Sequence, residues 1–398
     1  MLQRLGFVPP HFRDAGRKSI WVHAVSVGEV LAVSELVQRL RASFPDCKVL
    51  ISTTTDTGQR LAAARFGSEN VLYFPLDFAS AVRRWIRVLN PSLVVVAETE
   101  FWPNLLRIAK QSGAQVAVVN ARISDRSLPG YRRWRKPLGR VLDGIDLFLA
   151  QSTEDAKRLV EIGAPARRVS VSGNLKYDIP LATPPLIVKE LRAAFERSSA
   201  GPILVCGSTL EGEESLLLRA FSAVLAKFPR AVMLLAPRHP QRFDDVAELL
   251  SKAGIPFSRR SNWDGEPLSG SVVLIDTIGE LAGLYGLADL AFVGGSLVPR
   301  GGHNIIEPAQ YGAAIIVGPH TENFRDIVGL FQSRGAVKVS DAENLSQDIL
   351  ALLANSEERD ALGKQAGETL QSQRGAMALT LARLEALLRE SKSGVGPA

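Results

Sequence analysis

The chain has 398 residues, of which 46% are hydrophobic and 22% charged, and its formal net charge is +6. This length suggests two or three domains, and the composition is ordinary for a globular protein with a substantial core. No run approaches the roughly 18 apolar residues that span a bilayer, and the segment 1–19 is too polar for a secretory signal. Cys47 and Cys206 lie inside apolar runs, which argues against a disulfide framework. The basic surface suits nucleic acid, anionic lipid or a phosphorylated substrate, and composition alone does not choose among them.

From Ile20 onward, short apolar runs alternate with segments in which apolar residues have helical spacing. The runs predicted to be strands are 20–24, 48–53, 93–98, 115–120, 147–150 and 168–173, and the predicted helices are 30–43, 57–66, 78–89 and 102–112. Because the runs show no polar alternation, they suit parallel strands that are buried on both faces.

A proline-containing segment, 174–188, is predicted to be a linker, and the same alternation resumes after it. The later predicted strands are 202–207, 231–237, 271–276, 289–295 and 314–319, followed by a mostly helical tail over 357–392. We therefore expect an α/β protein with two doubly wound, Rossmann-like domains, 1–174 and 175–398 with the long C-terminal helix. Because ligands bind at the carboxyl ends of such strands, the two domains should face a cleft, as in GT-B glycosyltransferases and some epimerases and phosphorylases.

Two acidic stretches end predicted strands of the first half. Glu29 follows Ser26 and Gly28 at the start of a helix, where the helix dipole stabilises a carboxylate. It is either a purely structural residue or a base that the dipole keeps ionised at neutral pH, with the small neighbours leaving room for a substrate. Glu98 and Glu100 alternate at the end of another strand, so one of them could face the cleft. The alternative there is helix capping around the residues that follow.

The segment 120–140 is the most basic stretch of the chain, and acidic residues are sparse in it. Its cations are interleaved with Tyr131 and Trp134, a mixture that suits an anionic membrane surface, a phosphorylated lipid or nucleic acid. The alternative is a solvated face without a partner.

The second half contains a candidate anion site. Arg238 and His239 follow a predicted strand, and an arginine there suits bidentate phosphate binding. Over 292–318, a strand leads into Gly294-Gly295-Ser296, then into Gly301-Gly302-His303-Asn304 and a helix with Glu307 in its first turns. Glycine N–H groups at a helix start can bind an anion, and Glu307 can accept hydrogen bonds from a ribose or sugar. The spacing fits neither a dinucleotide fingerprint nor a P-loop, and no motif suggests a metal site.

Eight motifs, taken in order, resemble the 3-deoxy-D-manno-octulosonic acid (Kdo) transferases, which move Kdo from CMP-Kdo onto the lipid A precursor. They are HAVSVGE (23–29), ETEFWPN (98–104), NARISDRS (120–127), GNLKYD (173–178), GSTLEGEE (207–214), LAPRHPQRF (235–243), DTIGEL (276–281) and FVGGSLVPRGGHNIIEPA (292–309). One departure is Leu210, where the family commonly has histidine.

The resemblance implies an inverting, metal-independent enzyme without a cofactor, in which Glu29 is the catalytic base and Glu98 a second essential acid. The residues implied for the CMP-Kdo donor are Gly207, Ser208, Thr209, Pro237, Arg238, His239, Gly279, Glu280, Gly295, Ser296, Gly302, His303, Asn304 and Glu307. Those implied for the lipid A precursor are Ser26, Gly28, Arg122, Ser124 and Lys176.

The implied partners also include an anionic membrane surface but no nucleic acid. The implied location is the cytoplasmic face of the bacterial inner membrane, either peripheral or through an N-terminal anchor that this chain does not contain. Rival hypotheses are a sugar-nucleotide epimerase, a retaining synthase, and a non-enzymatic protein that binds RNA or lipid through its basic surface. Retaining enzymes of this fold often have two glutamates eight positions apart, whereas Glu307 is followed at that spacing by Ile315.

Overall fold

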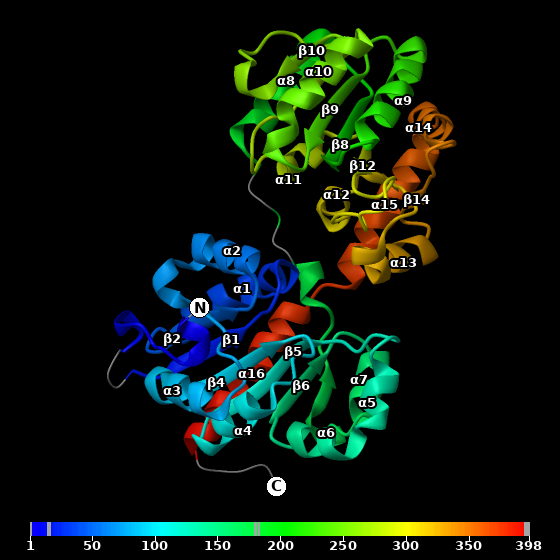
Figure 1. Cartoon of the computed structure of the whole chain (residues 1–398). Coiled ribbons are helices and arrows are strands. Elements are labelled where there is room, and N and C mark those ends of the chain that lie inside the picture. The colour runs from blue at the N-terminus through cyan, green and yellow to red at the C-terminus, as the bar shows by residue number, and fades with distance from the viewer. Residues whose placement is uncertain (1, 14–16, 179–180, 182–183, 394–398) are drawn as a thin grey trace. The chain divides into compact units, whose positions relative to one another are not determined.

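The computed structural model describes residues 2–13, 17–178, 181 and 184–393. The chain forms two compact units (Figure 1), of which the first comprises Met1–Ile179 with Gln373–Ala398 and the second Pro180–Ser372. Each unit is built around a parallel sheet of seven strands, which confirms the predicted α/β class.

The first sheet has the strand order β3-β2-β1-β4-β5-β6-β7. Its strands are β1 Ser19–His23, β2 Lys48–Thr53, β3 Val71–Tyr73, β4 Pro91–Ala97, β5 Gln115–Ala121, β6 Leu147–Ala150 and β7 Val169–Val171. The chain order reverses direction between β1 and β4, and such a switch point is where open α/β sheets bind their ligands.

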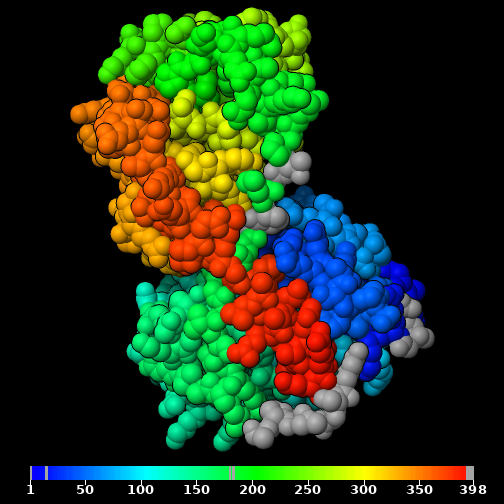
Figure 2. Space-filling view, turned by 180° about the vertical axis from the view of Figure 1, so that it is seen from behind, coloured from blue at the N-terminus to red at the C-terminus, as the bar shows by residue number. Residues whose placement is uncertain are grey.

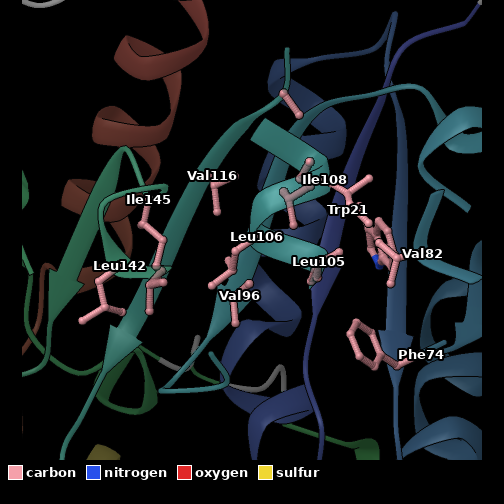
Figure 3. Close-up of a cluster of buried hydrophobic side chains, with 14 of the residues drawn as sticks. Trp21, Phe74, Val82, Val96, Leu105, Leu106, Ile108, Val116, Leu142 and Ile145 are labelled. Atoms are coloured by element: carbon pink, nitrogen blue, oxygen red, sulfur yellow. The ribbon is translucent and has the colours of Figure 1, made fainter. Parts of the chain in front are cut away.

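Helices cover both faces of this sheet, which explains the continuous apolar runs of its strands. Ile20 and Val22 pack with helices α1 Val27–Ser43, α2 Asp56–Phe66 and α16 Ala376–Ser393. Trp21 and Val96 pack on the other face, where Leu105 of α4 lies against the sheet (Figure 3). The helices of this second face are α3 Ala79–Leu89, α4 Pro103–Gln111, α5 Leu128–Arg133, α6 Arg135–Leu142 and α7 Thr153–Glu161. The short 3₁₀ turns η1 Leu2–Leu5, η2 Pro10–Phe12 and η5 Leu175–Asp178 also belong to this unit.

The second sheet has the order β10-β11-β9-β8-β12-β13-β14. Its strands are β8 Ile203–Thr209, β9 Val232–Pro237, β10 Phe257–Arg259, β11 Ser271–Leu274, β12 Leu290–Val293, β13 Ala314–Val317 and β14 Lys338–Val339. The helices of this unit are α8 Leu186–Ser198, α9 Glu213–Lys227, α10 Phe243–Ala253, α11 Leu281–Leu284, α12 Ile306–Gln310, α13 Arg325–Ser333, α14 Leu345–Ala354 and α15 Ser356–Ser372. No helix among the described residues is long and apolar enough to cross a membrane.

The helical tail differs from the prediction of one segment that belongs to the second domain. It is broken into α15 and α16, with Gly375 in the left-handed region at φ +109°. The Asp178 carboxylate accepts hydrogen bonds from the N–H groups of Gly375 at 2.8 Å and Met377 at 2.5 Å, which fixes the start of α16. Met377 and Leu384 are buried in the core of the first unit, and α16 lies beside α1 (Figure 2). The chain thus returns to the first unit at its end. Of the expected linker, residues 179–180 and 182–183 lie outside the described residues.

Candidate active site

Glu29 is held at the carboxyl end of β1 by the cap of helix α1. Ser26 is the N-cap residue, and its hydroxyl accepts a hydrogen bond from the Glu29 N–H at 3.3 Å. The Glu29 carboxylate in turn accepts hydrogen bonds from the Val25 N–H at 2.8 Å and from the Ser26 hydroxyl at 2.9 Å. This reciprocal arrangement fixes the carboxylate, which belongs to a residue only 8% exposed.

The surroundings of Glu29 favour its protonated form. Burial and, to a smaller extent, the negative charges of Glu98 and Glu100 raise its pKa to about 7, while the hydrogen bonds from Val25 and Ser26 oppose the shift. Burial and the neighbouring carboxylates thus oppose the ionised form that the sequence led us to expect at neutral pH. A carboxyl group with its pKa near the working pH is well suited to general base catalysis.

Glu98 lies directly after β4 in a left-handed backbone conformation, at φ +55°. Its N–H donates to the Val119 carbonyl at 2.9 Å, and Lys176 Nζ lies 3.4 Å from its Oε1. Asn120, at the end of neighbouring β5, is also left-handed, at φ +54°, and its Oδ1 accepts from the Leu175 N–H at 3.0 Å. Such conformations cost on the order of 1–3 kcal/mol in non-glycine residues and cluster at functional sites. The structure thus brings together Glu98 and Lys176, which lie far apart in the sequence.

The other residues expected to bind the acceptor have different surroundings. An added Cβ at Gly28 would meet only Ser26 Oγ, at 3.9 Å, so this position leaves the space that the sequence suggested. Arg122 is exposed at the carboxyl end of β5, and its carbonyl accepts a hydrogen bond from Thr99 at 3.0 Å. Ser124 bonds Ser127 in the turn before α5, so its hydroxyl already serves the fold.

His23, at the end of β1, was not predicted as a site residue. It is fully buried, its Nδ1 lies 2.9 Å from the Ser52 hydroxyl, and its ring stacks on Phe74 at 4.0 Å. Burial lowers its pKa to about 3, so the ring is neutral, and its Nε2 has no partner among the described residues. Its only sequence signal was its place in the motif that contains Glu29.

In the second unit, Glu213 binds the amides of the loop after β12, which is part of the segment where the sequence suggested an anion site. Its carboxylate accepts hydrogen bonds from the N–H groups of Gly295 at 2.7 Å, Ser296 at 2.9 Å, Leu297 at 2.9 Å and Leu210 at 2.8 Å. These amides are therefore not available to a phosphate. The Ser296 hydroxyl is also used, because it donates to the Val293 carbonyl and accepts from the Gly318 N–H. Gly295 and Ser296 thus stabilise the loop.

Four other residues of the second unit interact electrostatically, and one of them has a ring nitrogen without a partner among the described residues. Arg238 and His239 are exposed after β9, and burial, with smaller electrostatic effects of these two residues, lowers the pKa of His303 to about 4. Burial raises the pKa of Glu307, whereas its hydrogen bond to Asn304 and the charge of Arg238 lower it. His303 Nε2 is buried and has no partner among the described residues. The group therefore offers a cation and a neutral imidazole to a ligand oxygen.

The backbone around this group is closely packed. Thr209 ends β8 with a buried hydroxyl that also lacks a described partner, and Ser208 before it has φ +56°. A Cβ at Gly207 would lie 2.0 Å from the Tyr285 hydroxyl, so only glycine fits there. Gly302, at φ +74°, donates its N–H to the Gly295 carbonyl at 2.7 Å. These residues form the carboxyl ends of β8 and β12 and the loop beside them.

Glu280, in the loop after β11, already has hydrogen-bond partners within the second unit. Glu280 accepts a hydrogen bond from Arg260 at 3.0 Å and another from the Thr277 hydroxyl. Gly279 before it has φ +91°, while Pro237 is simply the last residue of β9. Among the described residues, no group of three or more His, Cys, Asp or Glu side chains is arranged to hold a metal ion.

Comparison with solved structures identifies the fold class. The structure is similar to that of a glycosyltransferase from Rickettsia africae, with a TM-score of 0.57 at 14% identity over 96% of this chain and 100% of that one. It is equally similar to a UDP-GlcNAc 2-epimerase from Neisseria meningitidis, with a TM-score of 0.57 at 15% identity over 93% and 100%. At such identities the likeness concerns the fold alone, and the fold is the GT-B type that glycosyltransferases and epimerases share.

Sequence comparison identifies the family. Residues 1–179 match the family model described as 3-deoxy-D-manno-octulosonic-acid transferase (kdotransferase). The 3-deoxy-D-manno-octulosonic acid transferase of Haemophilus influenzae is 37% identical over 94% of this chain and 88% of its own, and that of Bordetella pertussis is 38% identical over 95% and 91%. The chain therefore belongs to the 3-deoxy-D-manno-octulosonic acid transferase family and is a glycosyltransferase, as its motifs indicated.

Proposed function

We propose that this enzyme transfers Kdo from CMP-Kdo to the lipid A precursor in lipopolysaccharide biosynthesis, by an inverting and metal-independent reaction. The observation that carries the proposal is the fixed, buried carboxyl group of Glu29 with a pKa of about 7 beyond the carboxyl end of β1. The first unit binds the acceptor and the second binds the donor.

In the proposed reaction, Glu29 takes the proton from the acceptor hydroxyl as that oxygen attacks the anomeric carbon of Kdo. The new bond joins the acceptor oxygen to that carbon, the bond from that carbon to the phosphate oxygen breaks, and CMP leaves with the electron pair. A single displacement of this kind inverts the configuration. General base catalysis of this sort contributes roughly 10²–10⁴-fold. The Lys176 ammonium, 3.4 Å from Glu98, offsets part of the negative charge that opposes ionisation of Glu29.

Negative charge grows on the phosphate of CMP as it leaves. Arg238 is the proposed cation for this charge, and the neutral His303 ring offers a hydrogen bond next to it. These groups support a mechanism without a metal. The proposal does not use the amides of Gly295 and Ser296, because Glu213 already binds them.

The acceptor is a lipid, so the enzyme should work at the cytoplasmic face of the inner membrane. Segment α5–α6 supports this placement, since Arg133, Arg135 and Lys136 are exposed there around a Trp134 side chain that is 66% exposed. Cations and an exposed indole suit the headgroup region of an anionic membrane.

The test is incubation with CMP-Kdo and lipid A precursor, with the product identified by mass. Glu29→Gln should lower kcat by roughly 10²-fold or more, while the affinity for CMP-Kdo stays unchanged. Glu35→Gln on the same helix, where Glu35 pairs with Arg39, is the matched control and should keep normal turnover. A near-normal kcat for Glu29→Gln would end the assignment of the base. Activity that EDTA abolishes and Mg²⁺ restores would refute the metal-independent mechanism, and product from UDP-GlcNAc instead would favour an epimerase.

A further inference from the structure

Three residues with amide side chains, Asn120, Gln151 and Asn174, are linked by hydrogen bonds in the first unit and are here called the amide network. Asn120 belongs to β5, and Gln151 directly follows β6, the neighbouring strand (Figure 1). Gln151 Nε2 donates to the Asn120 carbonyl at 2.9 Å, and Gln151 Oε1 accepts from Asn174 Nδ2 at 3.0 Å. The amide network therefore ties the segment after β7 to the carboxyl ends of two other strands.

The amide network holds the backbone of Lys176 and of the residue before it. The Leu175 N–H donates to Asn120 Oδ1, and the Lys176 N–H donates to Asn174 Oδ1, both at 3.0 Å. The Lys176 ammonium lies 3.4 Å from Glu98 Oε1, beyond the end of β4. The hydrogen bonds of the amide network therefore determine where the lysine backbone stands, and with it the distance from the ammonium to Glu98.

Asn120 occupies its place at an energetic cost. It is completely buried, its backbone is left-handed at φ +54°, and its Nδ2 has no hydrogen-bond partner among the described residues. Left-handed non-glycine residues cluster at functional sites, and a buried polar atom without a partner calls for an explanation. Glycine would adopt this backbone conformation without strain. What the asparagine side chain adds here is therefore its hydrogen bond to the segment that carries Lys176.

The turn that carries Lys176 also lies beside the proposed base. Turn η5 contacts α1, and the first turn of α1 contains Glu29. Burial and, to a smaller extent, the negative charges of Glu98 and Glu100 raise the pKa of Glu29. The acidic residue of η5, Asp178, accepts hydrogen bonds from the start of α16. Lys176 is therefore the cation of η5 that reduces the effect of Glu98 on Glu29.

We propose that Asn120 is a positioning residue of the transfer reaction, which acts through the amide network by holding the Lys176 ammonium against Glu98. Held there, the ammonium offsets the charge of Glu98 and leaves the Glu29 carboxylate able to take the proton from the acceptor hydroxyl. Asn120 itself touches neither substrate nor the reacting atoms. The inference rests on the proposed function, because it concerns the ionisation of the proposed base.

The first test is the pH dependence of turnover with CMP-Kdo and lipid A precursor. Asn120→Gly removes the side chain and leaves the left-handed backbone free of strain. It should lower kcat by up to about 10-fold at pH 6.5 and hardly at pH 8.5, since the loss of a nearby cation raises the pKa of a carboxyl group by about 1. Asn90→Gly is the matched control, because Asn90 of the same unit is also left-handed, at φ +45°, and ends α3. It should keep normal kcat at both pH values.

A double-mutant cycle tests whether Asn120 acts through Lys176. If it does, Asn120→Gly should lower kcat far less in a Lys176→Met background than in the unaltered enzyme. Gln151→Ala breaks the amide network at a partly buried residue and should act in the same direction, so the test remains decisive if Asn120→Gly folds poorly. Equal losses of kcat in both backgrounds, or a loss that is the same at pH 6.5 and pH 8.5, would overturn the proposal.

Measurements without substrate separate this proposal from the proposed function. Hydrogen exchange at the Leu175 and Lys176 amides should be faster in Asn120→Gly and unchanged in Asn90→Gly. The carboxyl carbon signal of Glu29, assigned by its loss in Glu29→Gln, should titrate at higher pH in Asn120→Gly. Unchanged exchange and an unchanged titration midpoint would overturn the proposal even where transfer of Kdo is confirmed. If the unaltered enzyme does not transfer Kdo, these two measurements still decide whether Asn120 holds Lys176 in place.

Discussion

The raised pKa of Glu29 predicts that removing its ionisable group stabilises the protein at alkaline pH. An unfolded glutamate loses its proton near pH 4.5, whereas Glu29 in the folded chain holds it to about 7. Between these values the folded state binds more protons than the unfolded state. The contribution of Glu29 to the free energy of unfolding is therefore fully present below pH 4.5 and is lost as pH rises through 7. A shift of this size corresponds to about 3 kcal/mol at about 1.4 kcal/mol per unit.

Glu29→Gln removes the free-energy cost of ionising this buried carboxyl group, which depends on pH. It also removes hydrogen bonds of Glu29, whose contribution to stability is nearly independent of pH. The free energy of unfolding of Glu29→Gln, relative to the unaltered enzyme, should therefore rise by up to about 3 kcal/mol between pH 4.5 and pH 8.5. Denaturant titration followed by tryptophan fluorescence measures it, because only Trp263 of the five tryptophans lies in the second unit. Glu35→Gln is the control and should show no such rise. A difference between Glu29→Gln and the unaltered enzyme that does not vary with pH would refute the reasoning.

Two further predictions concern the second unit and the start of α16. Arg238→Ala should raise the KM for CMP-Kdo and lower kcat, because the leaving phosphate loses its cation, whereas Arg219→Ala on the exposed side of α9 should change neither in steady-state assays. An Arg238→Ala enzyme with normal kinetics would remove that residue from the donor site. Asp178→Asn should lower the free energy of unfolding by about 1–2 kcal/mol and speed hydrogen exchange at the Gly375 and Met377 amides, which its carboxylate binds. Unchanged exchange at these amides would show that the start of α16 is held by other contacts.

The sequence predicted the fold well where apolar runs were long and buried on both faces. The strands that became β1, β2, β4 and β5 were all predicted, because five to seven consecutive apolar or small residues leave little ambiguity in a parallel sheet. The missed strands, β3, β10 and β14, have only two or three residues at or near the sheet edges, too few to show a pattern. The prediction for the helical tail was incomplete for a different reason. Gly375 is visible in the sequence, but the unit on which α16 packs depends on Asp178, almost 200 residues earlier.

The candidate site was predictable in part. Motif resemblance selected Glu29, Glu98 and Lys176 although they come from three distant segments, and the structure gives the pairing of Glu98 with Lys176. The protonation of Glu29 could not be read from the sequence, because burial and the neighbouring carboxylates decide it. The hydrogen bonds of the Gly295 and Ser296 amides could not be read from the sequence, because no local pattern shows that a carboxylate 82 residues earlier accepts them.

Two Gly-Glu pairs, Gly28-Glu29 and Gly212-Glu213, lie at strand-to-helix corners, and they show how similar sequences acquire different chemistry. Glu213 begins α9 in the second unit much as Glu29 begins α1 in the first, and both are buried at the end of a strand. Glu213 accepts four backbone N–H bonds from its own corner and the loop after β12, so its carboxylate is fully engaged and fixes that loop. Glu29 accepts one backbone N–H and one hydroxyl, and two further carboxylates raise its pKa. Proton transfer needs a carboxylate with unused capacity and a pKa near the working pH, and of these two corners only that of Glu29 provides both.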